Sequence, residues 1–256
     1  MRWPIIWLGL TQGLAEFLPI SSSGHLIVLK SLLGVRAPGA SLEVAMHVGT
    51  LAAVAVAYRQ DLRDLLRGFN TAGGRKQAGL IAWATVPAGL AGLIAQSWIF
   101  QFFRPDAVVV GWGLTSALVW LTPSFAVGSR TIQDLTWGEA FTIGLFQGVA
   151  LWPGLSRSGS TIFAGRSLGL DPEAAARFSF LLAIPAVAGA AALTLPAAVR
   201  ASAFPGSWLV IGCAVAAVSG LYAIQWVRQA LSSAWRWRLF GVYTAGAAIA
   251  AWWLGG

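Results

Sequence analysis

Residues Gly9–Gly34 read GLTQGLAEFLPISSSGHLIVLKSLLG, and a closely similar stretch returns 135 residues later at Gly144–Gly169 as GLFQGVALWPGLSRSGSTIFAGRSLG. The two copies align without a gap, and 11 of their 26 positions are identical. Chance agreement between common residues would give only a few identities over this length. The pattern therefore indicates an internal duplication, and its polar centre is the first place to look for a functional site.

Each copy has the pattern of an interrupted helix. In the first copy the apolar residues 5–18 are followed by Pro19 and three serines, and the apolar pattern resumes at His25. These two halves, of fourteen and ten residues, would rise only about 21 and 15 Å as helices, whereas the apolar core of a bilayer is about 30 Å thick. The second copy is broken in the same way at Pro153 and Gly154. Irregular backbone survives at membrane depth only where protein or water satisfies it, so we expect two re-entrant helical hairpins around a polar pocket.

The composition places the whole chain in a membrane. Of its 256 residues 57% are hydrophobic and only 10% are charged, whereas soluble domains carry about 25% charged residues. The net charge of +8 comes from clustered basic residues that indicate membrane topology, so we expect no nucleic-acid partner. Six further stretches are long and apolar enough to cross a bilayer: residues 42–58, 78–97, 107–124, 178–196, 207–226 and 239–254.

Three of these expected spans separate the two copies, so the second copy should enter the membrane from the opposite face. This predicts an inverted-topology repeat of residues 1–125 and 136–256 within one polytopic domain, residues 1–256. Eleven of the 17 basic residues fall in four loops that this topology places on one side, which agrees with the positive-inside rule. The predicted fold is an all-α integral membrane protein with six transmembrane helices and two re-entrant hairpins.

The tip of the first hairpin carries an acid, hydroxyls and an imidazole. Gln12 and Glu16 are four residues apart and should share one helix face, and ionisable groups inside a bilayer are usually functional. Ser21, Ser22 and Ser23 precede a half-helix whose free N–H groups can bind an anion. His25, three residues beyond Ser22, is close enough in principle to exchange a proton with its hydroxyl. We therefore expect Ser22, His25 and Glu16 to be catalytic.

The tip of the second hairpin keeps the serines and replaces the acid and imidazole. Arg157 stands where the first copy has Ser22, and a guanidinium can grip a phosphate with two parallel hydrogen bonds. The two tips together would form one composite cradle for a polyanion, with Arg157 as a fourth catalytic residue. The expected substrate-binding positions are Gln12, Ser21, Ser23, Gly154, Ser156, Ser158 and Thr161.

These motifs resemble the undecaprenyl pyrophosphate phosphatases of bacterial inner membranes, the family associated with bacitracin resistance. The resemblance covers essentially the whole chain. It is carried by Gln12 to Glu16, by the P-x-S-S-[ST]-G-H pattern at 19–25, and by the P-G-x-S-R-S-x-x-T pattern at 153–161. It implies removal of the terminal phosphate from a C55 polyprenyl diphosphate for reuse of the cell-wall lipid carrier, at a site that opens to the periplasm.

The resemblance also implies a divalent cation, Mg²⁺ or Ca²⁺, bound by Glu16 and Gln12. Many members have a carboxylate where this chain has Gln12, and that change leaves the metal preference open. Mg²⁺ often takes only one or two carboxylates besides phosphate oxygens and waters, so Glu16 with the substrate could suffice. Glu43 could help or could be a helix cap, and His47 is interpreted as a packing residue.

Some alternatives stay open at this point. His25 itself could be the nucleophile in place of Ser22. Broken helices in an inverted repeat are also typical of secondary transporters, so a carrier or flippase for a lipid phosphate or another anion is the competing function. The expected partners are the bilayer and the polyprenyl diphosphate, and a homodimer is left open.

Overall fold

A computed structural model describes residues 3–35, 41–95, 99–102, 104–125, 128–200 and 204–253, and these residues are almost entirely helical. They contain no β-strand, only an isolated bridge between Arg130 and Leu170. The all-α prediction is thus confirmed. The α-helices are α1 (Trp3–Phe17), α2 (Ser22–Leu32), α3 (Ser41–Ala57), α4 (Arg59–Arg67), α5 (Ala72–Ala95), α6 (Pro105–Leu121), α7 (Trp137–Val149), α8 (Arg157–Ser167), α9 (Pro172–Arg200), α10 (Gly206–Leu231) and α11 (Ala234–Trp253). Short 3-10 helices are η1 (Gly68–Asn70), η2 (Ile99–Phe102), η3 (Thr122–Ser124) and η4 (Ile132–Asp134).

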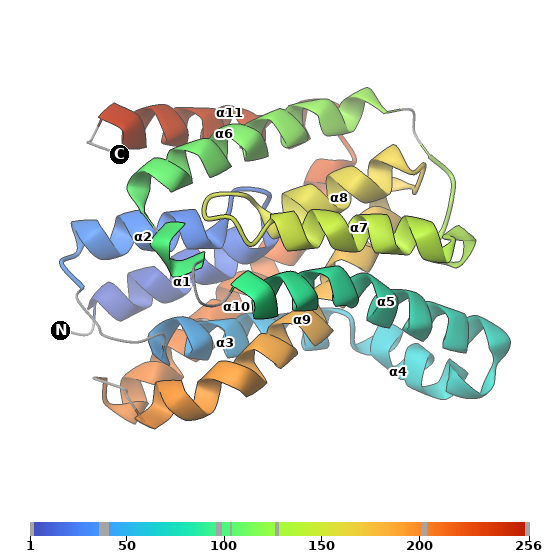
Figure 1. The fold of residues 1–256 in the computed structure, drawn as a ribbon, viewed down its shortest axis with the longest axis horizontal. Helices are drawn as coiled ribbons and strands as arrows, with labels where there is room; N and C mark the ends of the chain where they lie inside the picture. Colours follow the sequence, from blue (N-terminus) through green and yellow to red (C-terminus); the bar gives the residue numbers. More distant parts are fainter. Residues whose placement is uncertain are drawn as a thin grey trace.

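Both predicted interruptions are present, and each produces a pair of short helices. Helix α1 ends at Phe17 and α2 begins at Ser22, while α7 ends at Val149 and α8 begins at Arg157. Within each pair the two helices pack against each other. Figure 1 shows that the pair α1/α2 opens toward one end of the molecule and the pair α7/α8 toward the other, so that their tips meet near the centre.

Each of the six expected spans corresponds to one helix: α3, α5, α6, α9, α10 and α11. Within the described residues, four stretches are long and apolar enough to cross a membrane, namely 72–95, 106–124, 172–194 and 206–231. Helix α3 joined to the bent α4–η1 segment raises the number to five. Helix α11 begins with Arg236 and Arg238 close to its start, which lowers its hydropathy. The expected span ends at 96–97 and 254 lie outside the described residues.

The helices of the two halves interlock. Helix α1 packs on α10, and α7 packs correspondingly on α5, while α3 and α9 lie between them. These contacts are close because of small residues: a Cβ on Gly13 would lie 2.0 Å from the Ser219 hydroxyl of α10, and one on Gly144 would lie 2.2 Å from the Ala84 carbonyl of α5. Small residues at such contacts are typical of membrane helix packing.

The shape of each tip follows from its turn residues and from α6. Ser21 and Ser156 are N-caps that accept the amide hydrogens of Gly24 and Gly159, as expected for serines at a helix start. In the two turns, Gly154 adopts a positive φ of 86° and, unusually for a non-glycine residue, Ser21 one of 69°.

Helix α6 fastens both tips from one side. The Trp112 indole donates to the Ile20 carbonyl at 2.9 Å. The Thr115 hydroxyl donates to the Gly154 carbonyl at 2.9 Å and accepts the Ser156 amide at 2.9 Å. A single helix therefore sets the distance between the two tips.

Candidate active site

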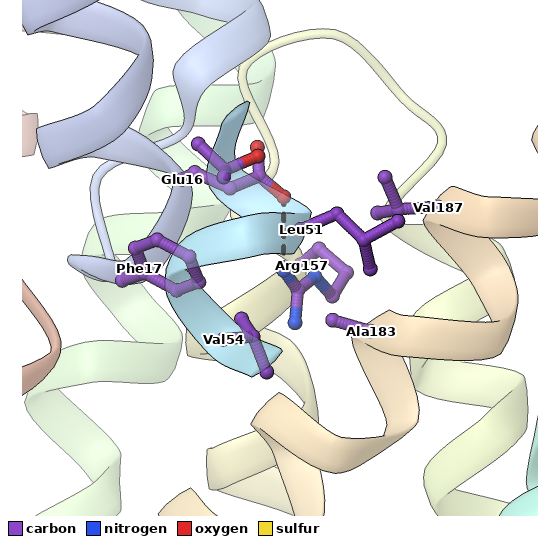
Figure 2. A pocket seen from close by; sticks show the side chains of 8 residues that line it. Glu16, Phe17, Leu51, Val54, Arg157, Ala183 and Val187 are labelled. Atoms are coloured by element: carbon purple, nitrogen blue, oxygen red, sulfur yellow. Dashed lines mark hydrogen bonds and ion pairs between the residues drawn. The ribbon is translucent and has the colours of Figure 1, made fainter. Parts of the chain in front are cut away.

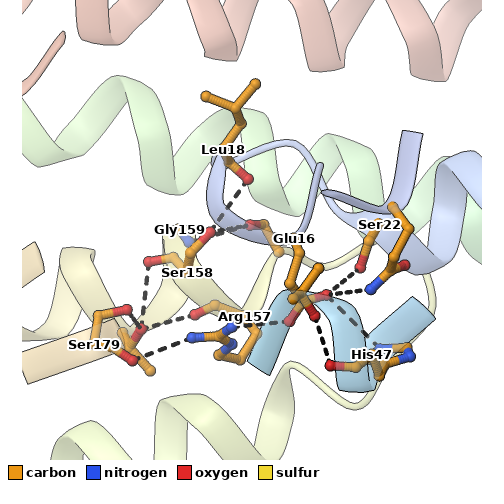
Figure 3. Close-up of polar contacts among 12 residues, drawn as sticks. Glu16, Leu18, Ser22, His47, Arg157, Ser158, Gly159 and Ser179 are labelled. Atoms are coloured by element: carbon orange, nitrogen blue, oxygen red, sulfur yellow. Dashed lines mark hydrogen bonds and ion pairs between the residues drawn. The ribbon is translucent and has the colours of Figure 1, made fainter. Parts of the chain in front are cut away.

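Glu16 at the end of α1 joins the two hairpins. Its Oε1 accepts a hydrogen bond from Arg157 Nη2 at 2.8 Å, and its Oε2 accepts one from Ser22 Oγ at 2.7 Å. The Glu16 side chain is only 9% exposed and that of Arg157 17%. Figure 3 shows these groups converging from α1, α2 and α8. The expectation that the two tips meet is confirmed by these contacts.

Gln12 lies one turn before Glu16 and is fully buried. Its Nε2 donates to Glu16 Oε2 at 3.1 Å, which confirms that the two side chains share a helix face. Its carbonyl oxygen Oε1 is buried and has no hydrogen-bond partner in the described part of the chain. A buried oxygen without a partner is costly, so this atom is available to a ligand.

Arg157 is held from a second direction. Its Nη1 donates to the Ser179 carbonyl of α9 at 3.1 Å. Removing one partner of a buried ion pair typically costs about 3–5 kcal/mol, because the other charge is left uncompensated. The guanidinium is thus pre-positioned beside Glu16, and an anion that enters the site would meet a fixed positive group.

His47 on α3 also faces this cluster. Its Nε2 lies 3.8 Å from Glu16 Oε2, and its Nδ1 lies 2.8 Å from the Glu43 carbonyl. The side chain is 36% exposed. The structure thus places His47, interpreted as a packing residue, beside Glu16, and its role stays untested. The rule that ionisable groups inside a bilayer are usually functional would have made this histidine a candidate, had it been applied to it as it was to Glu16.

The His25 side chain makes its contacts outside the cluster of Glu16, Ser22 and Arg157. Its Nδ1 is 2.7 Å from the Ser21 carbonyl, and its Nε2 is 2.7 Å from the Tyr243 hydroxyl. The ring stacks on Tyr243 and packs edge-on against Trp112. The expected proximity of His25 to the Ser22 hydroxyl is therefore replaced by a contact of that hydroxyl with Glu16, and a catalytic role for His25 stays a prediction.

The remaining predicted hydroxyls are engaged within and between the tips. The Ser158 hydroxyl donates to the Leu18 carbonyl at 3.2 Å, and the Thr161 and Ser179 hydroxyls are 2.6 Å apart. The Gly154 amide donates to Ser23 Oγ at 3.5 Å. Two serine pairs, Ser21 with Ser23 and Ser156 with Ser158, are each 3.2 Å apart. These contacts join the hairpins, and a role for the residues in substrate binding stays a prediction.

A narrow cleft begins at the ion pair (Figure 2). Its polar end is formed by Glu16, Arg157 and Thr50, and its walls are apolar. The volume of this cleft, about 10 Å³, is roughly the space of one water molecule. A headgroup larger than water would have to part these side chains. The apolar wall is formed by Phe17, Leu51, Val54, Ala183 and Val187.

The donor atoms of the cluster fit a cation that also binds phosphate. The described part of the chain holds no group of three or more His, Cys, Asp or Glu side chains placed to bind a metal. The oxygens of Glu16 and the free Oε1 of Gln12 nevertheless match the limited protein ligation that Mg²⁺ accepts when phosphates supply the rest. The residues present therefore fit a divalent cation bound together with its anionic substrate.

Comparisons with known proteins match most of this chain to one protein family. The family described as "Bacitracin resistance protein BacA" matches residues 5–250. Proteins named undecaprenyl-diphosphatase from Desulfatibacillum aliphaticivorans and Idiomarina loihiensis are each 38% identical to this chain; the alignments cover 89% and 91% of it, and 90% and 91% of those proteins. A third, from Myxococcus xanthus, is 40% identical, with 88% of this chain and 80% of that protein aligned.

Proposed function

We propose that this chain is a membrane phosphatase, because it belongs to the bacitracin resistance protein BacA family. It would hydrolyse undecaprenyl diphosphate to undecaprenyl phosphate and inorganic phosphate. This reaction would return the cell-wall lipid carrier to use. The observation that carries the proposal is the contact of Glu16 with both Ser22 and Arg157. It brings a hydroxyl, a carboxylate and a guanidinium to one point beside an apolar wall.

The proposed setting is the bacterial inner membrane, with six transmembrane helices, two re-entrant hairpins and a pocket open to the periplasm. The reciprocal packing of α1 on α10 and of α7 on α5 supports an inverted repeat. The lipid tail would lie along the apolar wall of the cleft, and the diphosphate would meet the ion pair.

In the proposed reaction the Ser22 oxygen attacks the terminal phosphorus. The new Ser22 O–P bond forms as the anhydride P–O bond breaks, and the electron pair leaves with undecaprenyl phosphate. Glu16, whose Oε2 already accepts the Ser22 hydrogen bond, orients the hydroxyl, and the hydroxyl proton passes to water. Water then attacks the phosphorus of the phosphoserine and the Ser22 O–P bond breaks. The OH of this water stays on the released inorganic phosphate, and its other proton passes to the Ser22 oxygen.

Charge stabilisation carries most of the rate enhancement in phosphoryl transfer. Arg157, aligned by Glu16 and the Ser179 carbonyl, would bind the oxygens of the terminal phosphate. A divalent cation held by Glu16 and Gln12 would supply further positive charge to the diphosphate. His25 would act by holding the turn before Ser22, since its Nδ1 contacts the Ser21 carbonyl.

The test is phosphate release from undecaprenyl diphosphate by purified protein in detergent. The Ser22→Ala variant should lose about 10³-fold or more in kcat, as is usual when a nucleophile is removed. Ser31→Ala, an exposed position on the same helix, is the matched control. A trapped phosphoenzyme should carry its phosphate on Ser22, and a phosphohistidine at His25 would favour the competing nucleophile.

The assay in detergent also distinguishes a phosphatase from a transporter, because detergent-solubilised protein has no second compartment to transport a substrate into. Phosphate release by the wild-type protein supports the enzyme. Absence of release, together with uptake of a lipid phosphate into vesicles, would favour the carrier. Full activity of Ser22→Ala would overturn the assignment of the nucleophile.

A further inference from the structure

The neutral ring of His47 can present a lone pair to the site. Its Nδ1 lies 2.8 Å from the Glu43 backbone carbonyl, and a carbonyl can only accept, so Nδ1 carries the ring hydrogen. In the neutral ring the lone pair is then on Nε2, which faces Glu16 Oε2. Histidines that bind metals usually donate their other N–H to a carbonyl or carboxylate in this way.

The distance between His47 Nε2 and Glu16 Oε2 suits a metal ion bound by both atoms better than a hydrogen bond between them. Nε2 and Oε2 are 3.8 Å apart, which is too far for a hydrogen bond. Two ligands bound to one ion at about 2.1 Å each lie at most about 4.2 Å apart. A cation between Glu16 and His47 is therefore possible without moving either backbone.

Gln12 supplies the independent observation. It is fully buried, and its Oε1 has no hydrogen-bond partner among the described residues. Its Nε2 is 3.1 Å from the same Glu16 Oε2 that faces His47, so the amide lies beside this oxygen. A cation there would satisfy an oxygen that the protein leaves unpaired.

Arg157 binds one oxygen of the Glu16 carboxylate, so a cation would bind at the other oxygen. Arg157 binds Oε1, whereas Ser22, Gln12 and His47 all face Oε2. The carboxylate thus separates the guanidinium from the second positive charge. The greater exposure of His47, 36% against 9% for Glu16, gives the ion an entry path from the α3 side.

We propose that Gln12 Oε1, Glu16 Oε2 and His47 Nε2 form the site of a divalent first-row transition-metal ion, such as Mn²⁺, in preference to Mg²⁺ or Ca²⁺. Ca²⁺ and Mg²⁺ are hard cations that take oxygen ligands, and an imidazole shifts the preference toward transition metals. The inference rests on the proposed function for the phosphate oxygens that would complete the ligand shell. Binding of the ion itself does not require turnover.

The chain contains only two histidines, which makes a spectroscopic test decisive. Full-length protein with a tag free of histidine is loaded with Mn²⁺ in detergent without substrate, and pulsed electron paramagnetic resonance is recorded. We expect coupling to one imidazole nitrogen, altered in protein grown with ¹⁵N-histidine. The coupling should persist in His25→Gln, the matched control, and disappear in His47→Gln.

Titration calorimetry gives the second readout. Mn²⁺ should bind the wild-type protein at least about ten-fold more tightly than Ca²⁺. The His47→Gln variant should lose at least about ten-fold in Mn²⁺ affinity, because even loss of a residue that only hydrogen-bonds a metal ligand typically lowers metal affinity by this factor. Absence of nitrogen coupling in the wild-type protein, its persistence in His47→Gln, or equal Mn²⁺ and Ca²⁺ affinities would overturn the proposal. None of these outcomes bears on phosphate release, so the phosphatase assignment stands or falls separately.

Discussion

Glu16 lies where a charge is expensive, and the surrounding contacts compensate for it. Arg157 neutralises one oxygen, while Ser22 and Gln12 donate to the other. An isolated charge removed from water costs several kcal/mol unless it is paired and hydrogen-bonded. The arrangement therefore keeps the carboxylate of Glu16 in contact with both the Ser22 hydroxyl and the Arg157 guanidinium.

Substitutions of His25 can distinguish a role in positioning the turn from a role in proton transfer. Its Nδ1 donates to the Ser21 carbonyl, and the side-chain amide of asparagine can supply a donor at the same place. We expect His25→Asn to keep phosphate release within about ten-fold of wild type and His25→Ala to lose about 10²-fold, a loss of the size usual for a misplaced reacting group. Equal, severe losses in kcat for both variants would instead indicate proton transfer or attack by the imidazole itself.

The sequence predicted the tips well because their determinants are local. Pro19 and the serines mark the first break, Gly154 and Ser156 the second, and the i, i+4 spacing placed Gln12 beside Glu16. Contacts between distant helices could not be read in this way. The position of His47 depends on how α3 packs beside α1, and the orientation of His25 depends on Tyr243, 218 residues away.

Helix α6 was predicted only as a span, yet it holds the second tip through Thr115. Thr115→Val keeps the side-chain shape and removes both hydrogen bonds, to the Gly154 carbonyl and from the Ser156 amide. Each buried group left without a partner costs about 1–3 kcal/mol. We expect a lower thermal midpoint in detergent together with reduced phosphate release, because Arg157 directly follows Ser156.

Thr194→Val is the matched control, since Thr194 is exposed and bonds only within its own helix α9. A Thr115→Val protein with wild-type activity and thermal midpoint would show that α6 does not position the tip.

The loop before α7 is held by Arg130 and Glu139, outside the candidate spans. Hydrogen bonds from the Arg130 guanidinium lower the pKa of Glu139 from 4.5 to about 2. Because the folded pKa lies below the unfolded one, the pair stabilises the fold above about pH 4.5, and this contribution is lost as the pH falls toward 2. The pair is largely solvated, so we expect only about 1 kcal/mol or less.

Glu139→Gln should therefore lower the thermal midpoint slightly at pH 7. Its midpoint should also fall less than that of the wild-type protein between pH 5 and pH 3. Parallel curves for the two proteins over that range would contradict a stabilising pair.

The two halves of the molecule make different contributions to one site, and this division needs opposite orientations. The first hairpin supplies Glu16 and Ser22, the second supplies Arg157, and their tips face each other from opposite ends (Figure 1). Were both hairpins to enter from the same face, their tips could not meet head to head. In the proposed inverted repeat, the duplication would produce a composite site because of the topology, and each copy would then be free to diverge.

Equivalent positions in the two copies test this topology directly. Leu32 and Ser167 are 135 residues apart, at the ends of α2 and α8, and both are exposed. In a background in which the single cysteine Cys213 is replaced by serine, Leu32→Cys should react with a membrane-impermeant thiol reagent in intact cells. Ser167→Cys should react only after the cells are permeabilised, because the basic loops beside it are expected on the cytoplasmic side.

Phosphate release by each variant serves as the control that the fold is retained. Labelling of both cysteines from the same side would rule out the inverted repeat, and the head-to-head meeting of the tips would then need another explanation. Labelling from opposite sides would mean that the ion pair of Glu16 and Arg157 joins two hairpins that enter the bilayer from opposite faces. A single buried charge pair would then lie at the meeting point of both halves, where the lipid headgroup must bind for the proposed reaction to occur.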